Sequence, residues 1–169
     1  ANKTRTAQRY DIKTQTRYNF SRLNFMYGTV EFQQDKFSPY LWQASQSIGY
    51  GRRLLDWHKM TFDVQAGPGL RQNRERFATE NRNDPILYSQ AVYQWLLSKS
   101  TTCSQTVTNQ LGHPDIETRA VTALTTKIID NIGMQLSYTV EHNSFIPPDS
   151  ANTQKTDTIT NINIVYNFL

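Results

Sequence analysis

The sequence has few of the residues that staple or interrupt a small fold. It contains one cysteine, seven glycines and six prolines in 169 residues, and no apolar run is longer than three residues. The single cysteine, Cys103, excludes a disulfide framework and a cysteine-rich zinc site. A membrane-spanning helix needs about 20 consecutive apolar residues, so this chain cannot cross a bilayer with helices.

Dense clusters of basic residues are also absent. The 18 Lys and Arg residues exceed the 14 Asp and Glu residues by four, and they are spread along the chain. Proteins that bind nucleic acids concentrate their basic residues in a patch or stripe. The pI of about 9.2 therefore does not indicate a nucleic-acid partner, and we expect none.

The sequence is rich in regular alternation of apolar and polar residues. From position 132 to 140 the even positions hold Ile, Met, Leu, Tyr and Val, whereas the odd positions hold Gly, Gln, Ser and Thr. Such a period of two is typical of β-strands, whose side chains point alternately to opposite faces. The pattern predicts nine strands, over residues 3–18, 21–34, 39–53, 58–72, 85–98, 101–112, 115–130, 132–145 and 154–168.

The predicted strands are about 12 to 16 residues long. Strands of soluble domains have about 5 to 6 residues, whereas a tilted membrane-spanning strand needs about 9 to 11. Short connections such as Leu54–Trp57 alternate with longer ones such as Gln72–Asp84 and Phe145–Thr153, as they do in bacterial outer-membrane barrels. We therefore predict an all-β fold, an antiparallel transmembrane β-barrel of the bacterial outer membrane.

The two faces of these strands predict two environments. In an outer-membrane barrel the apolar face contacts lipid and the polar face lines the interior. The charged residues that we expect to face the lumen are Asp63, Arg71, Glu117, Arg119, Lys127 and Glu141. The aromatic residues that we expect to form girdles at the membrane interfaces are Tyr40, Trp42, Tyr50, Tyr93, Trp95, Tyr138, Tyr166 and Phe168. The alternative is a soluble ligand-binding barrel whose apolar face points inward.

The number of predicted strands bears on the completeness of the barrel. Nine is odd, whereas single-chain bacterial barrels have an even number of strands. We therefore expect residues 1–169 to form one barrel domain that lacks one or more N-terminal strands, the complete barrel having about 10 to 12. A partner subunit that completes the barrel is an alternative. A lumen of this size is filled by side chains or leaves a narrow, porin-like pore.

Four glycines share the polar parity of two neighbouring strands, and we expect them to form an inner-wall patch without side chains: Gly49, Gly51, Gly67 and Gly69. Glycine permits strand curvature, and Pro68, between two of them, favours a β-bulge. The alternative function of this patch is to make room for a bulky residue or a ligand.

One short motif suggests catalysis. His142 and Ser144 share a strand face and adjoin Glu141, a set that resembles the sites of outer-membrane lipid hydrolases, in which a histidine activates a serine. Glu141 points to the opposite face, so another acid would be needed, and we expect no catalytic residue and a protein that is not an enzyme. The alternative is an outer-membrane lipid-modifying hydrolase that uses His142 and Ser144. The remaining histidines, His58 and His113, fall on separate connections, so we expect no metal site and no cofactor.

The segment 72–84 carries three arginines and three acidic residues. This balance predicts a solvated outer loop. Contact between its arginines and lipopolysaccharide phosphates is the alternative. The main partner that we expect is the lipid bilayer itself.

Several short motifs resemble those of a known family. They include SIGYGR at residues 47–52, DVQAGPGL at 63–70, FIPP at 145–148 and a last strand ending in VYNF at 165–168. Their order, over residues 21–168, resembles that of the YdiY-like salt-induced outer-membrane proteins, a family of uncharacterised function. The resemblance implies an outer-membrane barrel with a structural or narrow-pore role in envelope or salt stress, and it supplies no catalytic residues.

Overall fold

A computed structural model describes residues 9–35, 40–75, 82–113, 115–129, 132–144 and 155–166. These residues form nine strands: β1 (Arg9–Asn19), β2 (Asn24–Asp35), β3 (Tyr40–Trp57), β4 (Met60–Glu75), β5 (Arg82–Leu96), β6 (Thr101–Leu111), β7 (Ile116–Ile129), β8 (Ile132–Asn143) and β9 (Thr156–Tyr166). Each strand pairs antiparallel with the next in one sheet ordered β1 to β9. The predicted all-β, antiparallel fold is confirmed. Nowhere in these ranges is there a helix of the length and hydropathy that crossing a membrane requires.

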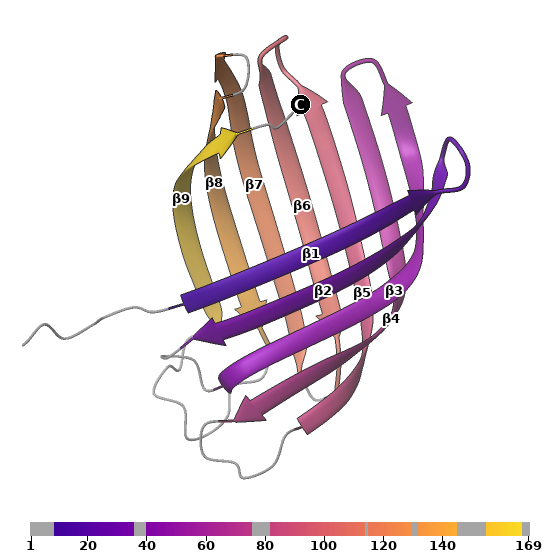
Figure 1. The fold of residues 1–169 in the computed structure, drawn as a ribbon, viewed down its shortest axis with the longest axis vertical. Helices are drawn as coiled ribbons and strands as arrows, with labels where there is room; N and C mark the ends of the chain where they lie inside the picture. Colours follow the sequence, from indigo (N-terminus) through magenta and orange to yellow (C-terminus); the bar gives the residue numbers. More distant parts are fainter. Residues whose placement is uncertain are drawn as a thin grey trace, which may run out of the picture.

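The sheet curls into a half-barrel (Figure 1), in which β1 to β4 lie in front of β6 to β9 and cross them obliquely. Long strands favour this shape because each adds its right-handed twist to that of its neighbours. The odd–even pairs β1–β2, β3–β4, β5–β6 and β7–β8 are joined at one end, here called the short-turn end. The other connections lie at the opposite end, here called the long-loop end.

The strands differ from the sequence prediction at several points. The loop expected over residues 72–84 is shorter than predicted, because β4 continues to Glu75 and β5 begins at Arg82. The turn expected at Leu54–Trp57 is wrong, because β3 continues to Trp57, which pairs with Met60. Pro85 lies inside β5 and pairs with Leu70 on β4. The bulge expected at Pro68 is also wrong, since the β3–β4 register shifts elsewhere, between Tyr40 and Trp42 and between Arg53 and Leu55. Glycines on both sides of Pro68 let the strand bend without an extra residue.

Large apolar side chains cover the outer face of the sheet. Met134 and Leu136 on β8 are 47% and 46% exposed, and Ile162 and Ile164 on β9 are 73% and 84% exposed. Among the described residues the buried side chains are mostly polar, and the buried aromatic cluster consists of Phe25, Tyr27 and Tyr88. The alternative of a barrel with an apolar interior is therefore wrong for the described part of the chain.

The inner-wall glycines serve two purposes. A Cβ atom on Gly49 would lie 2.7 Å from the Cα atom of Gly67, and one on Gly67 would lie 2.6 Å from the Cα atom of Gly49. Carbon atoms prefer 3.5–4.0 Å, so these two glycines permit a close approach of β3 and β4. At Gly51 the ring of Phe25 occupies the space that a Cβ atom would need. We expected a patch without side chains. Instead, the ring of Phe25 fills part of it.

Candidate functional site

The interior of the half-barrel contains a network of charged side chains. Arg119 on β7 forms ion pairs with three carboxylates. Its guanidinium lies 3.3 Å from Asp11 on β1, 3.2 Å from Glu31 on β2 and 3.1 Å from Glu141 on β8. The ammonium group of Lys13 lies 3.5 Å from Glu31. We call these five residues the Arg119 cluster. It joins the first two strands to β7 and β8 across the interior, without any strand pairing between them.

A second group lies nearer to the long-loop end. The side chain of Arg71 on β4 is fully buried, and its Nη2 atom donates to the backbone oxygen of Asp115 at 3.1 Å. The carboxylates of Asp115 and Glu117 lie 3.6 and 3.8 Å from this guanidinium, and Gln43 on β3 donates to Glu117 at 3.1 Å. A Cβ atom on Gly112 would lie 2.8 Å from Nη2 of Arg71, so this glycine makes room for the guanidinium.

A chain of amide side chains crosses the middle of the interior. Gln15 on β1 donates to Gln65 on β4 at 3.3 Å, Gln65 donates to Gln90 on β5 at 3.1 Å, and Gln90 donates to Thr108 on β6 at 3.1 Å. Gln65 and Gln90 each accept one hydrogen bond and donate another, so their polar groups are buried with little loss of hydrogen-bonding free energy. This amide chain separates the two ends of the interior.

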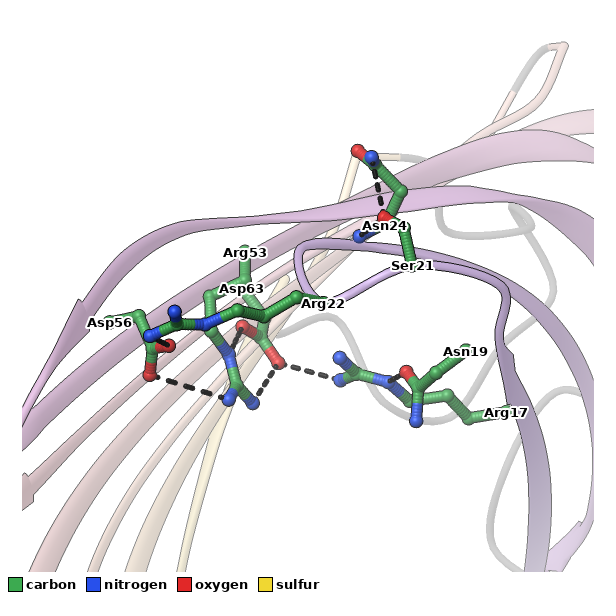
Figure 2. Close-up of polar contacts among 8 residues, drawn as sticks. All are labelled: Arg17, Asn19, Ser21, Arg22, Asn24, Arg53, Asp56 and Asp63. Carbon is green, nitrogen blue, oxygen red and sulfur yellow. Dashed lines mark hydrogen bonds and ion pairs between the residues drawn. The ribbon is translucent and has the colours of Figure 1, made fainter.

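A third charged group, the turn-end cluster, lies at the short-turn end and is drawn in Figure 2. Arg53 binds both carboxylate oxygens of Asp63, at 2.8 and 3.2 Å, and Arg17 binds the same carboxylate at 2.6 Å. Asp56 lies 3.7 Å from Arg53 and 3.4 Å from Arg22. Three arginines thus share two carboxylates, and one of the three, Arg22, is 85% exposed.

Several buried polar atoms in the long-loop half have no hydrogen-bond partner among the described residues. They include side-chain oxygens of Thr29, Asn73 and Gln110, which are 4%, 3% and 4% exposed, and two nitrogens of Arg71. Buried polar groups nearly always bind protein or ordered water.

The structure places the residues that we expected in the lumen as follows. Asp63, Arg71, Glu117, Arg119 and Glu141 all lie in the charged groups described above. Lys127 lies near the short-turn end of β7, with an exposed side chain.

Sequence reasoning missed most of the partners of these residues. Asp11, Lys13 and Arg17 share the inward parity of β1, so the alternation of that strand could have identified them. No sequence signal indicated Asp115, which lies in a connection and meets Arg71 only because the sheet curls.

The expected aromatic girdles are placed unevenly. Trp42 stacks with Phe32 at the long-loop end, with ring centroids 6.5 Å apart. At the short-turn end, Tyr50 donates to Asn24 at 2.6 Å, and Tyr93 and Trp95 lie near the end of β5. Tyr138 differs from the expectation, because it lies in the middle of β8, opposite Thr122 and Thr160. The side chains of Tyr40 and Tyr166, and all of Phe168, lie outside the described residues.

His142 and Ser144 are engaged separately. His142 Nδ1 lies 2.9 Å from the Thr156 hydroxyl on β9, and the Ser144 hydroxyl accepts a hydrogen bond from the Ile116 amide at 2.8 Å. Glu141 lies on the inner face with Arg119. Among the described residues no hydrogen bond joins the histidine to the serine, so the arrangement of a serine hydrolase is not assembled in this part of the chain.

The remaining expectations concern the metal site and the segment 72–84. In the described ranges, no three His, Cys, Asp or Glu side chains are placed to hold a metal ion. Arg82 binds Asp84 at 2.9 Å and the backbone oxygen of His113 at 3.0 Å, so this arginine is engaged within the protein. Arg76 and Glu80 lie outside the described residues.

A curled antiparallel sheet with an apolar outer face and a charged interior defines a β-barrel-like protein. The chain belongs to the family described as "Protein of unknown function, DUF481", whose model matches residues 1–168. It is similar to "Uncharacterized protein YdiY" of Escherichia coli (strain K12), with 27% identity over 168 residues. This match covers 98% of the chain but 64% of the relative, so the chain spans less than two thirds of that protein. No solved structure matches. The expected YdiY-like family is confirmed.

Proposed function

We propose that this protein is a β-barrel of the bacterial outer membrane, embedded through its apolar outer face. The observation that carries the proposal is the reversed distribution of polarity. Side chains such as Ile162 and Ile164 are exposed, whereas charged side chains such as Arg71 and Glu31 are buried. In water this arrangement would expose a large apolar surface, which soluble monomers avoid. In a bilayer it places hydrocarbon against lipid and polar groups against water.

The strand lengths agree with this proposal. The shortest strands have 11 residues and the longest, β3, has 18, whereas a tilted strand needs about 9 to 11 residues to cross a bilayer. Each strand is therefore long enough to cross and to extend beyond the membrane.

The two edges of the sheet constrain how the barrel closes. Strands β1 and β9 both run from the long-loop end toward the short-turn end, so they point in the same direction. An antiparallel closure therefore requires an odd number of further strands between them. We propose that the same polypeptide supplies these strands. The alternative is that a partner subunit supplies them, and measurement of the oligomeric state of the closed barrel would reveal such a partner.

The interior supports a non-enzymatic role, structural or as a narrow pore. The buried Arg71, the Arg119 cluster and the amide chain follow one another along the interior. Barrels of about 8 strands are filled by side chains and open channels appear near 16 strands, so a barrel of intermediate size leaves at most a narrow pore. The link to envelope or salt stress rests on the family resemblance.

Vesicle association tests the membrane proposal. The full chain, refolded with phospholipid vesicles, should remain with the vesicles after an alkaline carbonate wash and should be protected from protease. A stable monomer that stays in solution without detergent or lipid would refute the proposal.

Conductance in planar bilayers tests the narrow-pore role. The wild-type protein should conduct weakly or not at all, and Arg71→Ser should raise the conductance because it removes the guanidinium that lies between β4 and β7. Arg22→Ser removes the same charge from a side chain that is 85% exposed, so it is the matched control. If Arg71→Ser and Arg22→Ser leave the conductance equally low, the role is structural.

A further inference from the structure

A cavity of about 290 Å³ lies at the short-turn end of the interior. It is lined by residues of the five strands β1 to β5. Gln15, Gln65 and Gln90 of the amide chain bound it on one side, and Arg17 and Asp63 of the turn-end cluster bound it on the other. This volume lies at the lower end of the range of ligand pockets, about 300–1,000 Å³, so it suits a small ligand.

The charges around this cavity are unequal. Asp63 already accepts three short contacts from Arg53 and Arg17, and its carboxylate is therefore saturated with cationic donors. Two guanidiniums line the cavity against this one carboxylate. Asp56 lies 3.7 Å from Arg53 but does not line the cavity. Among the lining residues a cation would therefore meet net positive charge, whereas an anion would be attracted.

Arg17 is held in place and retains a free edge. Its Nε atom donates to Asn19 at 2.8 Å, its Nη1 atom donates to Asp63 at 2.6 Å, and its guanidinium carbon lies 3.5 Å from the centroid of the Phe25 ring. Within the described ranges no hydrogen bond or ion pair uses its Nη2 atom. Stacking on an aromatic ring fixes the plane of a guanidinium, so little entropy is lost when it binds a ligand.

We propose that this cavity binds a small oxyanion, a carboxylate or a phosphate group, between the free edge of Arg17 and the glutamine amides. An arginine with a fixed plane is the side chain best suited to oxyanions, since its N–H groups match the spacing of their oxygen atoms. The glutamine NH₂ groups carry further N–H donors. This proposal is independent of the membrane proposal, because it depends only on the short-turn end of the interior.

Calorimetric titration of the full chain, refolded in detergent and kept at constant ionic strength, tests the proposal. The probes are acetate and inorganic phosphate, with methylammonium as the cationic control. We expect saturable binding of at least one of the two anions and none of methylammonium. Acetate and phosphate together distinguish a carboxylate site from a phosphate site. Absence of saturable binding of both anions would overturn the proposal.

Three variants test the assignment to Arg17. Arg17→Gln should weaken anion binding at least tenfold, whereas Arg22→Gln, which removes the same charge outside the cavity lining, should change it less than twofold. Asp63→Asn should strengthen binding, because it removes the carboxylate that competes for two guanidiniums while Asn19 and the Phe25 ring still hold Arg17. A gain of affinity cannot arise from misfolding.

The opposite results would refute the assignment. Equal weakening by Arg17→Gln and Arg22→Gln would show a general electrostatic effect, and weaker binding by folded Asp63→Asn would show that Arg17 is not the ligand. If circular dichroism shows that Arg17→Gln does not fold, Arg17→Lys replaces it. This variant keeps the charge and should weaken binding less than tenfold but measurably, and unchanged affinity would contradict the proposal.

Discussion

Replacement of Arg119 by glutamine should destabilise the protein more than any other single loss of a positive charge in the Arg119 cluster. The change removes the cation that three carboxylates on β1, β2 and β8 share. Glutamine keeps much of the length and some hydrogen-bonding capacity, so the main loss is electrostatic. The free energy of unfolding should therefore decrease.

The magnitude follows from the burial of the partners. The side chain of Arg119 is 26% exposed, and those of Glu31 and Glu141 are 10% and 13% exposed. Breaking a fully buried ion pair costs about 3–5 kcal/mol, and breaking a surface pair costs about 0–1 kcal/mol. For these intermediate exposures we expect a loss of about 2–3 kcal/mol.

The assay is equilibrium unfolding by urea in phospholipid vesicles, followed by tryptophan fluorescence. Lys13→Gln is the control, because Lys13 belongs to the same cluster, is 30% exposed and makes one ion pair at 3.5 Å. The Lys13→Gln change should lower the free energy of unfolding by no more than about 1 kcal/mol. Equal losses for the two variants, both below about 1 kcal/mol, would mean that these pairs behave as surface pairs, and the reasoning from burial would be refuted.

Three other substitutions, two of them paired with a control variant, test the packing and the faces of the sheet. Gly67→Ala should lower the unfolding free energy by about 3 kcal/mol, because its Cβ atom would meet the backbone of β3, whereas Gly28→Ala, with open space around it, should change it by less than about 0.5 kcal/mol. Gly112→Ala should cost about 1–3 kcal/mol, since it displaces the guanidinium of Arg71; an unchanged urea midpoint would contradict that packing. Leu136→Lys, near the middle of β8, should lower the unfolding free energy in vesicles by about 2–4 kcal/mol. Ile128→Lys, near the end of β7, should lower it by about 0–1 kcal/mol. Equal costs for these two lysines would argue against a bilayer around the outer face.

The sequence predicted the strands well and their ends less well. Alternation identifies a strand because side chains switch faces at every residue, and nine segments were found where nine strands occur in the described ranges. The end of β3 was predicted too early because Leu54 and Leu55 interrupt the alternation. The structure places a register shift there, between Arg53 and Leu55, and the strand continues to Trp57.

The candidate site could be predicted by residue type and face but not by partner. The inward parity of Arg119 and Glu141 follows from the sequence, and the register of β7 and β8 then pairs them directly. The contact between Arg119 and Asp11 joins residues 108 positions apart, and no local pattern predicts it. The cavity at Arg17 likewise exists only because β1 passes in front of β4 and β5.

The sequence by itself determined the period-two pattern, and therefore the strands and the division of each into an apolar and a polar face. These properties depend on each residue and its near neighbours along one strand. The curl of the sheet decided that the apolar face lies outside. The tertiary structure alone decided how tightly the sheet curls, and so which charges meet across the interior. The curl arises from the summed twist of nine strands and from the close approach of β3 and β4 at Gly49 and Gly67, and small changes in either would bring different charges together.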